Sequence, residues 1–267
     1  MDRRRVNGPE QSVPPLLKNL PERQPILNND GKRVDQRKID DLRPIFLKTG
    51  LVTQANGSAY IEVGNTKAVC AVYGPRQLKR AGFSSNGTLN CEFKFSTFSC
   101  TKRRAHMRDS EEKGYSQVLV QALAPAVRLE LLPKSAIDIY VNVLENDGTS
   151  SCLAAAIVAA STALADAGIE MLDQVTACSA VLSKKQIIMD GTELEEQQKD
   201  GNMVVSYMPS LNEVTHILQS GISEAATTSQ AIEQCIDGCS KIYSVMSTAL
   251  LQSLDNNNNE EEENNKL

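Results

Sequence analysis

The chain has 267 residues, of which 41% are apolar and 23% charged, with a net charge of −5 and a pI near 5.3. A chain of this length and apolar content can bury a sizeable core, as one large domain or two small ones. Its acidic balance argues against a freestanding DNA-binding module, which would normally be basic, but allows a local basic patch.

Targeting signals are not evident. No run of 18 or more apolar residues occurs, so no membrane span is predicted. The start, MDRRRVNGPEQSVPP, has arginines without an apolar segment behind them, and we expect no secretory signal. The seven cysteines are an odd number and most stand in apolar runs, which favours free thiols in a reducing compartment, the cytosol or nucleus.

Three segments are predicted along the chain. Residues 1–30 are proline-rich, polar and aperiodic, and are expected to form a flexible arm. Their triplet Arg3-Arg4-Arg5 is interpreted as part of a solvated end, with RNA contact or a localisation signal as the alternative. Residues 31–254 are expected to form one folded domain, and the Asn/Glu run of residues 255–267 a disordered tail.

The folded part opens with short runs rich in β-branched and aromatic residues, each bounded by Gly or Asn. Such runs predict strands in antiparallel hairpins. The predicted strands are 45–52, 58–63, 67–72, ended by Gly74-Pro75, and 89–98.

A basic loop follows the fourth strand. The stretch 102–108, KRRAHMR, carries four cations in seven residues and is the densest positive patch of the folded part. Such a loop could track phosphates, because Lys and Arg neutralise them and release counterions; a solvated loop before a helix is the equal alternative. His106 lacks a neighbouring Cys, Asp or second His, so we expect it to be exposed and predict neither a metal ion nor a cofactor.

The remaining elements alternate helices and strands. A helix is predicted from the acidic turn 109–112, with a kink at Pro125 and an end at Leu132-Pro133. The further elements are a strand at 137–144, a helix at 151–167, strands at 175–182, 186–189, 202–208 and 214–218, and a helix at 223–254. Cys235 and Cys239 share one face of the last helix, and without a second thiol pair they are interpreted as core residues. The order, ββββ–α–β–α–ββββ–α, indicates an α+β fold.

The stretch 135–171 resembles a phosphate-binding unit, since a strand feeds a helix through the turn Glu145-Asn146-Asp147-Gly148. A helix start offers free N–H groups and a positive dipole end to an anion. The turn supplies Thr149, Ser150 and Ser151 but neither Lys nor Arg.

Three phrases in this chain resemble motifs of the RNase PH family. They are RVDQR (33–37), GSAYIEVGNTKAVCAVYGPRQ (57–77) and VNVLENDGTSSCLAAAIVAASTALADAGIEM (141–171), and the resemblance covers about residues 33–250. Within the family, RRRVNGPEQSVPP, AVRLELLP and DGTSSCLAAA are most similar to a ring subunit of the eukaryotic RNA exosome. The resemblance implies an RNase PH-like fold of two related β/α halves (ribosomal protein S5 domain 2-like), and a hexameric ring around a channel for single-stranded RNA.

Active family members cleave RNA from its 3′ end with inorganic phosphate, using an arginine after the Asp-Gly turn and a pair of aspartates. Carried onto this chain, the arginine position falls on Ser151 counting forward, or on Leu153 counting back from the helix end. The paired aspartates fall on Glu196 (or Gln197) and Asn202, with Asp200 nearby. The degenerate phosphate-site positions are therefore Thr149, Ser150, Ser151 and Leu153, and the degenerate acidic-site positions are Glu196 and Asn202.

We therefore expect a non-catalytic ring subunit that supports 3′–5′ processing, including that of rRNA, and degradation of RNA. The candidate RNA-binding residues are Arg76, Lys102, Arg103, Arg104 and Arg108. The implied partners are other RNase PH-like ring subunits, cap subunits with OB-type modules and single-stranded RNA. The implied locations are the nucleus, including the nucleolus, and the cytoplasm. The alternatives are an active phosphorolytic 3′–5′ exoribonuclease, a composite site shared with an active neighbour, and a general α+β binding protein.

Overall fold

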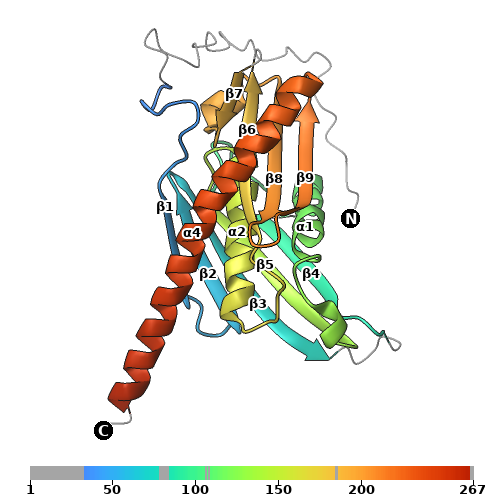
Figure 1. Ribbon diagram of the computed structural model, residues 1–267, viewed down its shortest axis with the longest axis vertical. Coiled ribbons are helices and arrows are strands. Elements are labelled where there is room, and N and C mark those ends of the chain that lie inside the picture. Colours follow the sequence, from blue (N-terminus) through green and yellow to red (C-terminus); the bar gives the residue numbers. More distant parts are fainter. Residues whose placement is uncertain (1–32, 78–83, 106, 108, 184–185, 265–267) are drawn as a thin grey trace, which may run out of the picture.

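The computed structural model describes residues 33–77, 84–105, 107, 109–183 and 186–264 (Figure 1). The predicted arm of residues 1–30 lies outside this part of the chain. The strands are β1 (Ile45–Thr49), β2 (Gly57–Val63), β3 (Thr66–Gln77), β4 (Thr88–Phe95), β5 (Ser135–Glu145), β6 (Thr176–Ser183), β7 (Gln186–Met189), β8 (Gly201–Met208) and β9 (Glu213–Gly221). The helices are α1 (Ser110–Leu123), α2 (Thr149–Asp166), α3 (Glu193–Glu196) and α4 (Ala225–Asn264), with a 3₁₀ turn at Leu129–Leu131. The predicted order of strands and long helices is confirmed, and so is the α+β class.

The first half forms a five-stranded sheet in the order β1-β2-β3-β5-β4. β1, β2, β3 and β5 are antiparallel neighbours, as expected for hairpins, and Gly64 (φ +57°) sits in the tight turn before β3. β4 instead runs parallel to β5, which is possible because α1 provides the crossover between them. The third strand does not end at Gly74: it continues to Gln77 after a register shift between Tyr73 and Arg76.

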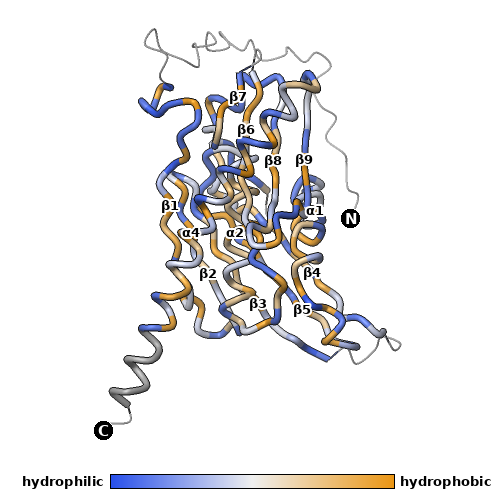
Figure 2. Tube along the Cα trace, in the orientation of Figure 1, coloured by the Kyte–Doolittle hydropathy of each residue, from blue (hydrophilic) through white to orange (hydrophobic). Residues whose placement is uncertain are grey.

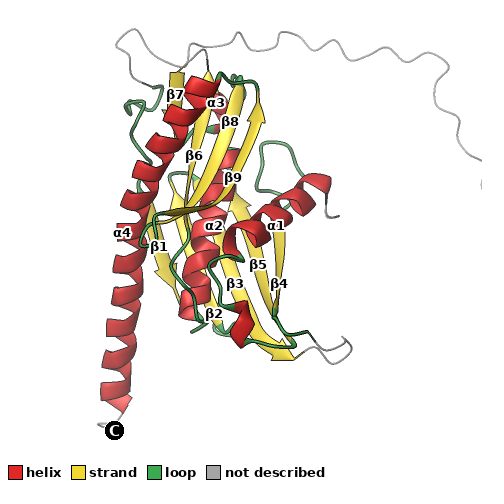
Figure 3. Cartoon of the chain, turned by 45° about the vertical axis from the view of Figure 1, so that its right-hand side comes forward, coloured by secondary structure: helices red, strands yellow, loops and turns green. Residues whose placement is uncertain are grey.

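The second half forms a four-stranded antiparallel sheet in the order β7-β6-β8-β9. All eight residues of β6 are buried, since this strand lies inside the sheet with helices α2 and α4 against it. Figure 3 shows α4 running along the whole length of the molecule, past both sheets. Cys235 and Cys239 are fully buried on the inner face of α4, which confirms that they are core residues.

Helix α2 is the centre of the core, and it contacts β2 and β3 of the first sheet and β6 and β8 of the second. Figure 2 shows apolar segments converging around it. Small residues let α2 lie close to the first sheet: a Cβ on Gly57 of β2 would stand 2.3 Å from the carbonyl oxygen of Ala163 in α2. By length and hydropathy α2 could cross a membrane, but 83% of it is buried inside the fold, as in the core helix of a soluble protein.

Two predicted helix boundaries are wrong. α1 ends at Leu123, so Pro125 does not kink it but lies beyond it, because proline has no N–H with which to continue the hydrogen bonds of the helix. α4 does not end at Leu254 but continues to Asn264, through most of the run predicted to be disordered. The run has neither Gly nor Pro to stop a helix, and its four glutamates are good helix formers. Residues 265–267 lie outside the described part.

Candidate functional site

The turn between β5 and α2 meets the segment that joins β7 to α3. Gly148 makes this approach possible: its φ is +112°, and a Cβ there would lie 2.7 Å from the carbonyl oxygen of Gly191. The start of α2 and the short helix α3 are therefore brought into direct contact. The degenerate phosphate-site and acidic-site positions meet at this junction, although they are about 45 residues apart in the chain.

The carboxylate of Glu196 occupies the start of α2. Its Oε2 accepts hydrogen bonds from the Thr149 N–H (2.8 Å) and hydroxyl (2.6 Å), and its Oε1 accepts one from the Ser150 N–H (2.7 Å). Glu196 is itself buried, with 7% of its surface exposed. The first N–H groups of a helix lack partners within the helix and attract an anion. Here the chain supplies that anion from its own α3.

The other degenerate positions have partners within the chain. The Asn202 side-chain amide donates to the Ser150 hydroxyl (2.5 Å), and the Ser151 hydroxyl donates to Asp190 (2.8 Å). Leu153 is buried in the core. None of these groups presents a charge to a ligand.

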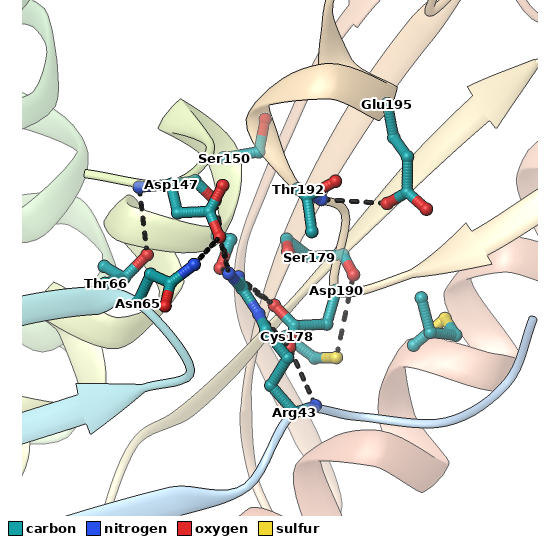
Figure 4. Close-up of polar contacts among 12 residues, drawn as sticks. Arg43, Asn65, Thr66, Asp147, Ser150, Cys178, Ser179, Asp190, Thr192 and Glu195 are labelled. Atoms are coloured by element: carbon teal, nitrogen blue, oxygen red, sulfur yellow. Dashed lines mark hydrogen bonds and ion pairs between the residues drawn. The ribbon is translucent and has the colours of Figure 1, made fainter. Parts of the chain in front are cut away.

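Behind Ser151 lies a buried ion-pair cluster around Arg43 and Asp190, shown in Figure 4. The Arg43 guanidinium donates to both carboxylate oxygens of Asp190 (2.7 and 2.8 Å) and to the carbonyl oxygen of Asp147 (3.2 Å). The Arg43 backbone N–H also donates to Asp190 (3.0 Å). Burial by itself raises the pKa of Asp190, but the hydrogen bonds and charge of Arg43 outweigh it and hold the pKa below its ordinary value.

Arg33 forms a second buried pair. It is fully buried, and its guanidinium donates to Glu195 (2.7 and 2.5 Å) and to the carbonyl oxygens of Met189 (2.7 Å) and Asp190 (2.9 Å). The two arginines thus fasten the segment 33–43 to the β7–α3 connection. Arg33 is predicted only as part of a motif, and Arg43 is not predicted as a site residue, because its partner Asp190 lies 147 residues away in the chain.

The basic loop lies across a cleft from the α2–α3 junction. The cleft has a volume of about 670 Å³ and an open mouth. Lys102 and Arg103, both exposed, line one side, and Thr149, Glu193 and Gln197 line the other. The structure therefore brings together two features that the sequence left apart, the basic loop and the degenerate phosphate site. Arg108 and His106 lie outside the described residues.

Arg104 differs from its neighbours in the loop. Its guanidinium lies 4.2 Å above the Phe95 ring, and it donates to the Cys100 sulfur (3.2 Å) and to Glu111 (3.2 Å). These contacts hold the loop against β4 and α1. We therefore assign Arg104 to positioning the loop and leave Lys102 and Arg103 as its exposed cations.

Arg76 is not part of the cleft. It pairs with Ala136 near the start of β5, whereas the basic loop follows Phe95, which pairs with Val143 near the end of that strand. At about 3.3 Å per residue, these positions are separated by about 23 Å along the sheet. Arg76 lies over the Tyr73 ring at 5.1 Å. Among the described residues, no group of three or more His, Cys, Asp or Glu side chains is placed to hold a metal ion.

Comparison with known proteins agrees with this geometry. Residues 41–170 match domain 1 of the 3′ exoribonuclease family and residues 173–238 match domain 2. The chain is 40% identical over 254 residues to the exosome complex component mtr3 of Schizosaccharomyces pombe, covering 94% of this chain and 96% of the relative. It is 39% identical to the exosome complex component Rrp41 of Cenarchaeum symbiosum, covering 84% and 93%. The solved structure of rice Rrp46 superimposes with a TM-score of 0.72 at 25% identity, covering 82% of this chain and all of the other.

Proposed function

The chain belongs to the 3′ exoribonuclease, or RNase PH, family, and we propose that it is a ring subunit of an RNA exosome without catalytic activity of its own. Its role in this proposal is to complete a six-membered ring of RNase PH-like chains and to line the path of single-stranded RNA. It would thereby support 3′–5′ RNA processing and degradation. Similarity to relatives that are named exosome complex components supports the ring assignment.

The observation that carries the non-catalytic part is the position of Glu196. In phosphorolysis, an oxygen of inorganic phosphate attacks the last phosphodiester, the bond to the preceding 3′ oxygen breaks, and a nucleoside diphosphate leaves. A phosphate has to be held beside the RNA end for this step. Here the Glu196 carboxylate takes the N–H groups at the start of α2, and a second anion beside it would be repelled.

The two arginines behind this point are not available as replacements, and Lys199 lies 4.0 Å from the Glu196 carboxylate itself. Arg43 and Arg33 are buried and paired with Asp190 and Glu195. Releasing either one would leave a carboxylate buried without its partner. Asn202, at the second acidic position, cannot ionise, so it cannot act as a general acid or base.

The enzymatic part is tested with the purified full chain. The chain is incubated with single-stranded RNA, magnesium and inorganic phosphate, and the products are analysed for nucleoside diphosphates. We expect none above the level of a heat-inactivated sample. Release of nucleoside diphosphates would instead support the alternative, an active phosphorolytic exoribonuclease.

The same assay on the assembled complex, with this chain as wild type or as Glu196→Gln, tests a composite site. A composite site that uses Glu196 predicts a loss of activity in the variant.

The RNA path is tested at the exposed cations of the cleft. Lys102→Glu combined with Arg103→Glu is expected to reduce crosslinking of single-stranded RNA to the assembled ring, because two attractive charges become repulsive. Lys48→Glu combined with Lys241→Glu is the matched control, since both lysines are exposed and neither lines the cleft. Equal crosslinking by both double variants would remove the loop from the RNA path. Arg76 and Arg108 remain candidate RNA contacts.

Partners and location complete the proposal. We expect the tagged chain to co-purify from cells with other RNase PH-like chains and with cap subunits that carry OB-type modules, identified by mass spectrometry. A fluorescent fusion is expected in the nucleus, including the nucleolus, and in the cytoplasm. Recovery of the chain without any family member would overturn the ring assignment.

A further inference from the structure

Phe98 is an exposed aromatic side chain in the turn that leads from β4 into the basic loop. It follows Phe95, the last residue of β4, by three positions, and 73% of its surface is exposed, whereas Phe93 and Phe95 are buried. Single exposed apolar residues are common on protein surfaces, so exposure alone does not indicate a binding site. The backbone that carries Phe98 and the side chains beside it give the exposure its meaning.

Hydrogen bonds fix the backbone on both sides of Phe98. The Ser96 N–H donates to the carbonyl oxygen of Val143 (2.9 Å), and the Ser99 N–H donates to the carbonyl oxygen of Ser96 (3.0 Å). The Asn146 N–H donates in turn to the carbonyl oxygen of Ser99 (2.9 Å). The turn is therefore tied to the end of β5 and to the connection that leads into α2. A ring on such a turn can bind a partner without the entropic cost of ordering the backbone first.

A further hydrogen bond joins this turn to the basic loop. The Arg104 N–H donates to the carbonyl oxygen of Thr97 (3.1 Å), so the chain folds back on itself between them. Phe98 and Arg103 come next to this bond on its two arms and therefore lie beside each other across the loop. Arg103 and its neighbour Lys102 are exposed and line the cleft. The exposed ring thus stands beside two exposed cations at the edge of the cleft.

We infer that Phe98 stacks on a base of the single-stranded RNA whose phosphates contact Lys102 and Arg103. This inference rests on the proposed function and adds a contact to the bases that the two cations cannot supply. Proteins that bind single strands combine cations, which follow the backbone, with aromatic rings on which the bases stack. Every base has a π face, so such a contact accepts RNA of any sequence.

The side chains beside Phe98 favour RNA over a protein partner. The core of a protein interface is apolar and poor in charged residues. Phe98 is flanked instead by Thr97 and, across the loop, by the charged Arg103. Met107, which is 71% exposed, lies beyond Arg104 and therefore outside the segment that the hydrogen bond to Thr97 closes.

The first experiment measures the affinity of the assembled ring for single-stranded RNA. Phe98→Leu keeps an apolar side chain but removes the ring, and is expected to weaken binding about fivefold or more. Phe98→Tyr keeps the ring and should bind as wild type does. Phe46→Leu is the matched control, since Phe46 is 55% exposed on β1 and does not line the cleft. A strand of the same length with abasic nucleotides should bind wild type and Phe98→Leu equally, because it offers no base to stack.

The second experiment observes the stacking directly. The chain has no Trp, so Phe98→Trp introduces a single indole into it. Its fluorescence is the difference between the ring with this variant and the ring with the wild-type chain. We expect single-stranded RNA to quench this emission, and the abasic strand to leave it unchanged.

Three results would overturn the inference: equal RNA affinity of wild type and Phe98→Leu, an indole that RNA does not quench, or a Phe98→Leu chain that no longer enters the ring. The last result would assign Phe98 to a contact between chains. If the double variant Lys102→Glu and Arg103→Glu still reduces crosslinking in any of these cases, the RNA path stands and only the stacking fails. If that double variant also has no effect, the proposed RNA path fails as well.

Discussion

Two groups of cations in this protein differ in their burial and in their partners. Arg33 and Arg43 lie in the interior, each held by a carboxylate in a two-bonded arrangement. Lys102 and Arg103 lie at the open cleft, exposed on its wall. A buried cation cannot be separated from its partner without a large cost, whereas an exposed one exchanges partners freely. The difference teaches that charge count alone does not locate a phosphate site; burial decides which cations can bind a ligand.

The largest effect is expected from breaking the buried cluster. Asp190→Ala removes the main partner of the buried Arg43 guanidinium and leaves it only the longer contact with the Asp147 carboxylate (3.3 Å), so it should lower the free energy of unfolding by about 3 kcal/mol. Urea denaturation followed by circular dichroism measures this value. Glu145→Ala is the control, because its ion pair with Lys67 is exposed and should contribute nothing measurable. If both variants unfold at the same urea concentration, the buried and the exposed ion pair contribute equally to stability, which would contradict this prediction.

The same pair has a defined pH dependence. The pKa of Asp190 is lowered in the folded protein from its ordinary value of 3.8, so its stabilising contribution is complete above that value. It is lost as the pH falls from 3.8 through the folded-state pKa, where the carboxyl becomes protonated. We therefore expect Asp190→Asn to be less stable than wild type at pH 7, by an amount that shrinks below pH 3.8. A difference that stays constant down to the acid limit would contradict an ionised Asp190.

A smaller effect is expected at the start of α2. Glu196→Gln keeps the shape of the side chain and one acceptor oxygen but removes the charge that faces the helix dipole. The free energy of unfolding should fall by about 1 to 2 kcal/mol. Glu130→Gln, at an exposed position, provides the control for the loss of one negative charge. An unchanged stability of Glu196→Gln would mean that the carboxylate is not what satisfies the helix start.

The elements of the fold could be predicted because their signals are local. Alternation in strands, the apolar face of α4 and the Gly64-Asn65 turn each reflect burial or backbone geometry within one short segment. Partners across the chain carry no such signal. The parallel pairing of β4 with β5 depends on the crossover through α1, and the four-residue helix α3 is too short to show a period.

The candidate site was predicted only in outline for the same reason. The motifs predict the loss of the arginine and of the paired aspartates, which stays a prediction, but they carried no signal for the contacts of Glu196 with the start of α2. Its contact with α2 depends on Gly148 allowing Gly191 to approach, which is a property of the packed structure. The sequence also could not distinguish the three cations at 102–104 from one another. In the structure Arg104 stacks on the Phe95 ring, whereas Lys102 and Arg103 are exposed.

The smallest effects on stability are expected within the basic loop, where Arg104 differs from its exposed neighbours Lys102 and Arg103. Arg104→Gln removes the contact with the Phe95 ring and the hydrogen bonds to Cys100 and Glu111. It should lower the free energy of unfolding by about 0.5 to 1 kcal/mol. Lys102→Gln combined with Arg103→Gln removes no contact of this kind and should leave stability unchanged.

RNA binding should separate the same variants in a different way. If Lys102 and Arg103 each neutralise one phosphate, their joint removal lowers the slope of log K against log salt concentration by about 1.4, since each contact to a single strand contributes about 0.7. The titration uses single-stranded RNA and the assembled ring, at several salt concentrations. Arg104→Gln is expected to weaken binding only as far as the loop loosens, with a slope close to that of wild type. An unchanged slope in the double variant would mean that these two exposed cations bind no phosphate. A drop of about 0.7 in Arg104→Gln would mean that a positioned arginine can also reach the RNA.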